Sequence, residues 1–259
     1  PILDGNKQYG RLRHKTPDSD GKKYHQAKGT MVHAYIPPGL KEIVKKNALI
    51  IVEGEFKALS LVEAGFAAVG ISGFYGWANK GCEEVVPELK SVLEVRRPEV
   101  IYFLGDNDTA LNYQFSDAAI KLAQAVRPTP IMLPRIPING PGKGADDCRR
   151  SLGNTNFAEW FQGLLDEATL VPSKIKAGGL ASALWEKERL NFGELDAIQS
   201  SIAQSQSIQL IASLMSNFPG EAGKLKKLAS KTFGIPVPDI GNSIKLERKV
   251  LSETIQKAN

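Results

Sequence analysis

The segment Ala48 to Ser60, ALIIVEGEFKALS, constrains the fold more than any other part of the chain. Its first five residues form a short apolar run without polar alternation, which predicts a strand buried on both faces, as in a parallel sheet. Gly54 allows a sharp exit, and apolar residues then recur at roughly helical spacing, which predicts a helix from Glu55. Glu53 therefore marks the carboxyl end of a strand, the edge at which open α/β sheets bind ligands.

A second buried strand is predicted at Val100 to Leu104, and it runs directly into Gly-Asp-Asn-Asp. Asp106 and Asp108 are two residues apart, so in an extended chain both carboxylates point the same way and can join Glu53 at the sheet edge. Three carboxylates without His or Cys suit a hard cation such as Mg²⁺, which prefers carboxylates together with substrate phosphates.

A third acidic element, the Lys-Gly-Ala-Asp-Asp of residues 143–147, follows a further predicted strand at Thr129 to Leu133. Glu-Gly, Asp-x-Asp and Lys-x-x-Asp-Asp in this order resemble the Toprim domain shared by bacterial-type primases, topoisomerases and some nucleases. The variant VEGEFKALS, GDND and KGADD is most similar to primase-type Toprim domains and to an uncharacterised Toprim-like domain of plasmid and phage replication proteins. The resemblance covers roughly Lys41 to Gly153, and more weakly Lys23 to Gly39.

This resemblance implies an α/β fold with a Rossmann-like, mostly parallel sheet flanked by helices, and Mg²⁺- or Mn²⁺-dependent chemistry on nucleic acid. By analogy Glu53 is a catalytic residue, as metal ligand or general acid/base. Lys143 is expected to contact phosphate or stabilise charge during the reaction. Gly144 stands where the primase pattern usually carries a further acid, which argues against a full two-metal site. The metal ligands implied are Glu53, Asp106, Asp108 and Asp146, with Asp147 beside the last of them.

Each motif also has a structural interpretation when it is taken alone. Glu53 would be favoured next to a helix N-terminus, and Gly-Asp-Asn-Asp is a common turn composition. Asp146 would cap a helix predicted over Asp147 to Leu152. The order of the three acidic signals along the chain favours a metal or phosphate site.

The net charge of +5 is unevenly distributed. Residues 1–46 hold 10 basic and 4 acidic side chains, residues 47–173 hold 11 and 16, and residues 174–259 hold 12 and 8. An acidic centre between basic flanks suits metal chemistry on a polyanion, although basic residues are often only solvated surface. We therefore expect DNA, primarily single-stranded, and nucleotides as partners.

The chain is predicted to have three parts: a basic N-terminal arm at 1–40, a Toprim-like catalytic domain at 41–170, and a small helical module at 178–259. The arm is expected to be a hairpin or loop, because basic and aromatic residues flank a Pro/Asp/Gly turn; a lead-in covering the sheet edge is the alternative. A mobile Pro/Gly-rich loop is predicted at Pro134 to Gly144. The candidate nucleic-acid contacts are Arg11, Arg13, Lys15, Lys22, Lys23, Lys57 and Arg135.

Two further regions leave alternatives open. The predicted strand Ala67 to Ile71 ends in a loop with Phe74, Tyr75 and Trp77, which either stacks a base or packs onto the domain. A helix interrupted by Pro87 and an amphipathic helix follow, and the C-terminal module has three helical segments whose partner is expected to be nucleic acid, a helicase or another replication protein. These helices are predicted at Cys82 to Val95, Gln114 to Val126, Leu195 to Phe218, Gly220 to Phe233 and Asp239 to Lys257.

No apolar stretch approaches transmembrane length, and the N-terminus lacks the apolar core of a signal peptide. We therefore expect a cytoplasmic protein with no membrane partner. Cys82 and Cys148 are not spaced as zinc ligands. The chain begins at Pro1, which fits a fragment or processed form of a larger protein.

The function expected from these signals is Mg²⁺-dependent phosphoryl transfer in DNA replication of a mobile element, primarily primer synthesis by a primase. A Toprim nuclease uses the same acidic set and is an alternative. A non-catalytic module that binds nucleic acid or a nucleotide is another, and Gly144 favours it modestly. A topoisomerase is less favoured, since it needs a nucleophilic tyrosine and none of the six tyrosines has a recognisable context.

Overall fold

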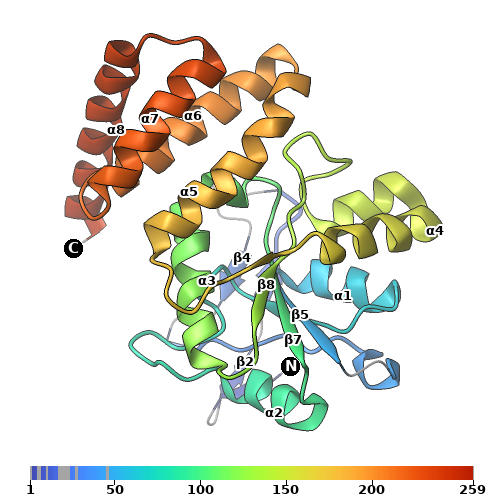
Figure 1. Cartoon of the computed structure of the whole chain (residues 1–259). Coiled ribbons are helices and arrows are strands. Elements are labelled where there is room, and N and C mark those ends of the chain that lie inside the picture. Colours follow the sequence, from blue (N-terminus) through green and yellow to red (C-terminus); the bar gives the residue numbers. More distant parts are fainter. Residues whose placement is uncertain are drawn as a thin grey trace.

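The computed structural model describes residues 2–4, 7–9, 11–16, 24–26, 29–44 and 47–258, with the backbone alone for residues 2–4, 7–9, 13 and 251–258. Its centre is a five-stranded sheet in the order β6-β5-β7-β8-β9. Figure 1 shows three of these strands, β5, β7 and β8, at the centre of the molecule. The first four strands in the sheet order run parallel, and β9 pairs antiparallel with β8, so the predicted mostly parallel α/β fold is confirmed. The strands are β5 (Ala48–Glu53), β6 (Ala68–Ile71), β7 (Val100–Leu104), β8 (Ile131–Leu133) and β9 (Thr169–Leu170).

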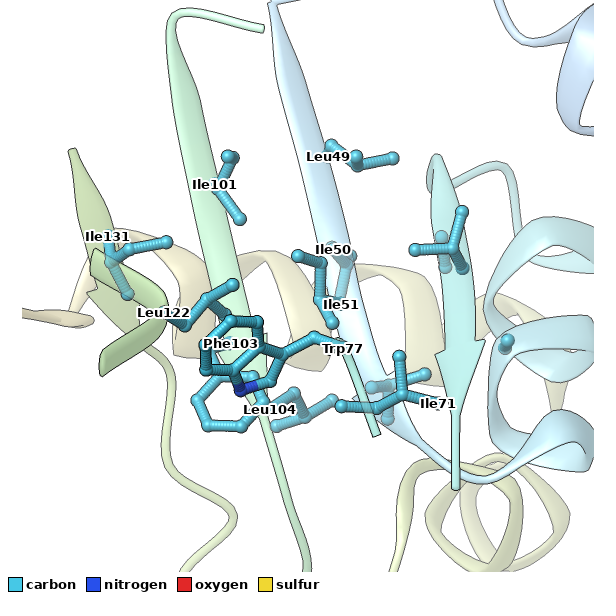
Figure 2. Packing of buried hydrophobic residues seen from close by; sticks show 14 of the residues in the cluster. Leu49, Ile50, Ile51, Ile71, Trp77, Ile101, Phe103, Leu104, Leu122 and Ile131 are labelled. Carbon is cyan, nitrogen blue, oxygen red and sulfur yellow. The ribbon is translucent and has the colours of Figure 1, made fainter. Parts of the chain in front are cut away.

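Strand β5 lies in the middle of the parallel strands, which explains its unbroken apolar sequence. Leu49 to Val52 are all buried, because β6 and β7 flank the strand and helices cover both faces. Strand β8 is shorter than predicted and begins only at Ile131, directly after Pro130, which cannot donate a hydrogen bond to a ladder. Figure 2 shows side chains from neighbouring strands, including Ile50 and Phe103, gathered into one cluster.

Helices flank the sheet on both sides. Helix α1 contacts α4, and α3 contacts α5 (Ala177–Glu188), and these pairs lie on different sides of the sheet in Figure 1. Buried apolar side chains of these helices join those of the strands; Phe115 of α3, for example, stacks on Phe103 with ring centroids 5.0 Å apart. Burial of one such side chain stabilises the fold by roughly 1.5–3 kcal/mol. The helices are α1 (Glu55–Glu63), α2 (Pro87–Arg96), α3 (Tyr113–Ala125) and α4 (Ala145–Asp166), with short 3₁₀ turns η1 (Leu40–Glu42) and η2 (Thr109–Leu111).

Two helix predictions are wrong in their bounds. Pro87 does not interrupt a helix but begins α2, where its fixed φ suits the first turn and its missing N–H has no intrahelical acceptor. Helix α4 begins at Ala145 after Gly144, and it continues to Asp166 across a break at Gly153, whose φ is 75°. Asp146 therefore lies inside the first turn and makes no side-chain cap hydrogen bond.

The N-terminal arm contains two antiparallel strand pairs. Strands β1 (Ile2–Asp4) and β2 (Lys7–Tyr9) pair with each other, as do β3 (Arg11–Arg13) and β4 (Tyr24–Gln26), so a hairpin-like arrangement is confirmed. The turn predicted between β3 and β4, with Lys22 and Lys23, lies outside the described residues. Farther along, Tyr35 exchanges two backbone hydrogen bonds with Gly70 of β6, at 2.7 and 2.9 Å, so this lead-in also covers the sheet edge.

The C-terminal segment is helical as predicted, but it begins with a helix, α5, that precedes the first helix predicted there, at Leu195. Figure 1 shows α5 between the sheet and the group of α6, α7 and α8. One side of α5 contributes Leu180 and Leu184 to the sheet's hydrophobic cluster, while Trp185 joins a second cluster formed by the last three helices. The predicted boundaries between the three parts stay a prediction. The elements are α5 (Ala177–Glu188), η3 (Arg189–Glu194), α6 (Ala197–Leu214), α7 (Pro219–Phe233) and α8 (Val237–Ala258).

None of the helices in the described part of the chain combines the length and apolar character that a membrane span requires.

Candidate active site

The acidic motifs meet at the carboxyl edge of the parallel strands. Glu53 ends β5, Asp106 and Asp108 follow β7, and Asp146 lies in the first turn of α4. The loops that carry them are joined directly, because the backbone N–H of Asn107 donates to the carbonyl oxygen of Lys143 at 2.8 Å. The structure therefore brings the four predicted metal ligands to one edge of the sheet.

Lys57 lies among these carboxylates. Gly54 directs the chain from β5 into α1 with φ 107° and ψ 141°, a conformation that favours glycine, and Lys57 follows in the first turn of the helix. Its ammonium donates to Oδ1 of Asp106, and both side chains are mostly buried, with exposed fractions of 18% and 17%. The prediction that Lys57 contacts nucleic acid is untested, but its partner in this structure is Asp106.

The charges at the site shift the pKa values of Lys57 and Glu53. Burial alone would lower the pKa of Lys57. The negative charge of Asp106 and its hydrogen bond, together with the charges of Glu53 and Asp146, outweigh burial, so the pKa of Lys57 is raised. Burial raises the pKa of Glu53, and repulsion from Asp106 and Asp108 raises it further. Attraction to Lys57 and Lys143 lowers the pKa but does not cancel these effects. The ammonium of Lys57 is thus fixed in its charged form, while Glu53 holds a proton more readily than an ordinary glutamate.

Asp106 and Asp108 converge in a way that differs from the prediction. The chain does not stay extended, because Asp108 has φ −97° and ψ 3° and begins the turn into η2. The two carboxylates still share a neighbour: Nζ of Lys143 lies 3.7 Å from Oδ2 of Asp106 and 3.9 Å from Oδ2 of Asp108. Lys143 is 63% exposed, so its ammonium is accessible to an incoming phosphate.

The loop of residues 134–144, which carries Lys143, is tied to the C-terminal helices. Arg135 forms an ion pair with Glu188 of α5, and the backbone N–H of Ile138 donates to Oε1 of the same carboxylate at 2.9 Å. On the other side, Nδ2 of Asn107 donates to the carbonyl oxygen of Ile138 at 3.3 Å. The expected mobility of this loop stays a prediction, as does a phosphate contact of Arg135.

The remaining candidate nucleic-acid contacts lie in the N-terminal arm. Arg11 donates to Glu55 at the start of α1 at 2.9 Å, and its guanidinium lies 4.3 Å from the ring centroid of Tyr24. Lys15 is exposed. The side chain of Arg13 and both Lys22 and Lys23 lie outside the described parts of the chain. Nucleic-acid binding by all of these residues stays a prediction.

The three aromatic side chains of the loop after β6 lie in different environments, two of them packed and one partly exposed. Phe74 packs edge-on against Phe115 at 5.3 Å, and Trp77 is only 4% exposed. Tyr75 is 42% exposed, its hydroxyl donates to Asp117 at 2.8 Å, and it lies beside a groove of about 1130 Å³ that also reaches Glu53. The packing interpretation holds for Phe74 and Trp77. Tyr75 is partly exposed with Nζ of Lys121 5.4 Å from its ring centroid, and its stacking on a base stays a prediction.

The oxygen donors at the site suit a hard cation. Oδ1 of Asp146 is buried without a hydrogen-bond partner, which makes it available to a ligand. Within the described residues, however, no three Asp, Glu, His or Cys side chains form a ready-made set of metal ligands. The donors therefore fit Mg²⁺ held by one or two carboxylates and completed by water and substrate phosphates, rather than by an all-protein cage.

Two functional features were not predicted. The ion pair of Lys57 with Asp106 had no sequence signal, because it joins the first turn of α1 to a loop 49 residues away. The anchoring role of Glu188 had no sequence signal, because WEKER resembles an ordinary solvated helix end.

Comparison with known proteins gives the following similarities. A family model described as "Domain of unknown function (DUF3854)" matches residues 41–155, the segment that holds all the acidic motifs. No curated protein matches the chain.

Two primase structures are among the similar folds. The Aquifex aeolicus primase, with its zinc-binding and RNA polymerase domains, is 14% identical with a TM-score of 0.42, covering 90% of this chain and 50% of that chain. The RNA polymerase domain of Mycobacterium tuberculosis primase DnaG, in complex with double-stranded DNA, is 13% identical with a TM-score of 0.40, covering 88% and 67%. This chain thus spans about half the length of the Aquifex aeolicus chain.

Proposed function

We propose that this chain performs Mg²⁺- or Mn²⁺-dependent phosphoryl transfer on nucleic acid, as primer synthesis on single-stranded DNA in the replication of a mobile element. The observation that carries the proposal is the convergence of Glu53, Asp106, Asp108 and Asp146 with two lysines at the carboxyl edge of the sheet. The motif order of a primase-type Toprim domain supports the choice of reaction.

In this proposal each side chain has a separate task. Asp106 and Asp108 would hold the metal, which would supply positive charge to stabilise the negative charge that develops in phosphoryl transfer. Glu53, whose pKa is raised by burial and by the neighbouring acids, would accept or return the proton of the attacking hydroxyl. Lys143, exposed beside both aspartates, would contact the incoming phosphate and stabilise its charge.

The test is an assay on a labelled single strand with Mg²⁺, with and without nucleotides. Primer synthesis appears as new oligonucleotides that carry label from labelled nucleotides while the template strand keeps its length, whereas a nuclease shortens the labelled strand without nucleotides. The Asp106→Asn, Asp108→Asn double variant should lose activity by at least about a hundredfold while keeping its fold, because it removes charge aimed at the metal. The matched control is Glu94→Gln with Glu159→Gln, which neutralises two exposed acids away from the site. Full activity in the aspartate variant would contradict the proposal.

One observation favours a second candidate, a non-catalytic module that binds nucleic acid or a nucleotide. The ammonium of Lys57 already satisfies Asp106, and Gly144 supplies no further acid. DNA affinity that persists in EDTA, with no turnover in Mg²⁺ or Mn²⁺, would support this candidate over the enzyme.

A further inference from the structure

The position of Gly144 is crowded by neighbouring side chains, whereas its backbone conformation does not require glycine. Its φ of −121° and ψ of 173° are extended values that any residue adopts. A Cβ atom at this position, however, would lie 2.5 Å from Cε of Lys57, and 3.0 and 3.2 Å from carboxylate oxygens of Asp146 and Asp106. Lys57 and a side chain at position 144 therefore compete for the same space.

The charge at this position matters as much as its volume. Lys57 reaches Asp106 from α1, whereas Lys143 approaches Asp106 and Asp108 from the loop. Four carboxylates and two ammonium groups leave a formal charge of about −2 at the sheet edge, which one divalent cation balances. Replacing Lys57 by an apolar residue and Gly144 by an acid would make that charge about −4, which suits two divalent cations.

We propose that Lys57 is a built-in cation that takes the place of one metal ion, so that the site binds at most one divalent cation. This inference rests on the proposed function, since it concerns the same metal site. The structure supports it through the ion pair that occupies Asp106 and through the close approach of the Lys57 side chain to position 144, where an added side chain would have to displace it. The primase pattern usually carries an acid at the position of Gly144. With Gly144 there and Lys57 beside it, the site is suited to one metal ion.

The experiment measures Mn²⁺ binding by calorimetry and by electron paramagnetic resonance in four proteins: the unaltered chain, Lys57→Met, Gly144→Asp, and Lys57→Ala with Gly144→Asp. Lys57→Met keeps the apolar length of the side chain and removes its charge, so the fold should be retained. It should bind Mn²⁺ at least about tenfold more tightly than the unaltered chain. The Lys57→Ala, Gly144→Asp variant should bind two ions. Gly144→Asp alone should lower the stability of the fold, because the new side chain overlaps with that of Lys57.

Lys143→Met serves as the matched control, because it removes a charge near the same aspartates without freeing space at position 144. The Lys143→Met, Gly144→Asp double variant should bind no second ion. A second site should form only when Lys57 is replaced. Equal Mn²⁺ affinity in Lys57→Met and the unaltered chain, or a single ion in Lys57→Ala with Gly144→Asp, would overturn the inference.

Failure of this inference is distinguishable from failure of the proposed function. If the unaltered chain synthesises primers with Mg²⁺ while the Lys57 variants bind Mn²⁺ no better, only the built-in cation is rejected. If the unaltered chain has no activity and no variant binds Mn²⁺ more tightly or in greater number, both proposals are rejected.

Discussion

Arg135 forms an ion pair with Glu188, a residue with no exposed surface, although the two are 53 residues apart in the chain. Glu188 belongs to α5, and Arg135 begins the loop that carries Lys143 to the acidic site. The same carboxylate accepts hydrogen bonds from the backbone of Ile138 and from Asn191, so its oxygens are well satisfied. Helix α5 thereby helps to position the loop that carries Lys143.

Removing the buried carboxylate should destabilise the protein and loosen the loop. Glu188→Ala leaves Arg135 and the N–H of Ile138 without their acceptor, and breaking a buried pair from one side costs about 3–5 kcal/mol. Urea denaturation should show this loss of unfolding free energy, and hydrogen exchange should quicken in residues 136–143. The matched control is Glu186→Gln, which breaks an ion pair with Lys224 at 2.6 Å between partly exposed side chains and should cost under about 1 kcal/mol. Equal effects of the two variants would contradict the anchoring role.

Glu53 should reduce stability at neutral pH when no metal is present. Its pKa is raised in the folded protein, so the proton it holds stabilises the folded state below the unfolded pKa, and this contribution disappears as the pH rises through the folded pKa. Glu53→Gln should therefore unfold at a higher temperature than the unaltered chain at pH 7 in EDTA, with the difference shrinking towards pH 4. A difference that is the same at both pH values would show that the ionisation of Glu53 is not its source.

The two cysteines should differ sharply in reactivity. Cys148 is buried in α4, and burial, with the nearby Asp147 and Asp146, raises the pKa of its thiol to about 12, whereas Cys82 is exposed. Because the thiolate is the reactive form, a thiol reagent at pH 8 should modify one cysteine in the folded protein and two in denaturant. Mass spectrometry should place the first label on Cys82, and rapid native labelling of Cys148 would contradict its buried position.

Tyr75 should contribute to the binding of single-stranded DNA if the groove beside Glu53 receives bases. Stacking of a base on an aromatic ring contributes about 1–3 kcal/mol, so Tyr75→Ala should weaken the affinity for a single strand roughly fivefold or more. Tyr75→Phe keeps the ring but loses the hydrogen bond to Asp117, and it should bind nearly as well as the unaltered chain. Fluorescence anisotropy with a labelled oligonucleotide compares the three proteins, and unchanged affinity in Tyr75→Ala would remove the ring from the binding surface.

The sheet and its acidic edge were predictable because they depend on local sequence. A continuous apolar run such as Leu49 to Val52 can be buried only inside a parallel sheet or a core helix, and Gly54 marks where the strand ends. Acids placed directly after such runs must then lie at the carboxyl edge. The mostly parallel order of strands follows from the alternation of strands and helices.

The features that were missed depend on contacts between distant segments. The turn at Asp108 agrees with the turn composition of Gly-Asp-Asn-Asp, but the 3₁₀ turn η2 that follows it was not predicted. Lys57 appears in the sequence as one more polar residue on a helix, and only the approach of the 105–108 loop makes Asp106 its partner. Glu188 looks solvent-exposed in sequence, because its burial results from the docking of α5 against the loop that contains Arg135.

The most direct test of the metal site is a calorimetric titration of Mg²⁺ with a non-hydrolysable nucleotide present, on the unaltered chain and on Asp106→Asn with Asp108→Asn. Mg²⁺ is expected to need substrate phosphates to complete its coordination, so the nucleotide supplies the missing ligands, and its own Mg²⁺ binding is subtracted in a titration without protein. We predict Mg²⁺ binding to the unaltered chain that disappears in the double variant. Equal binding by both proteins, or no binding by the unaltered chain, would contradict a metal site formed by these two aspartates.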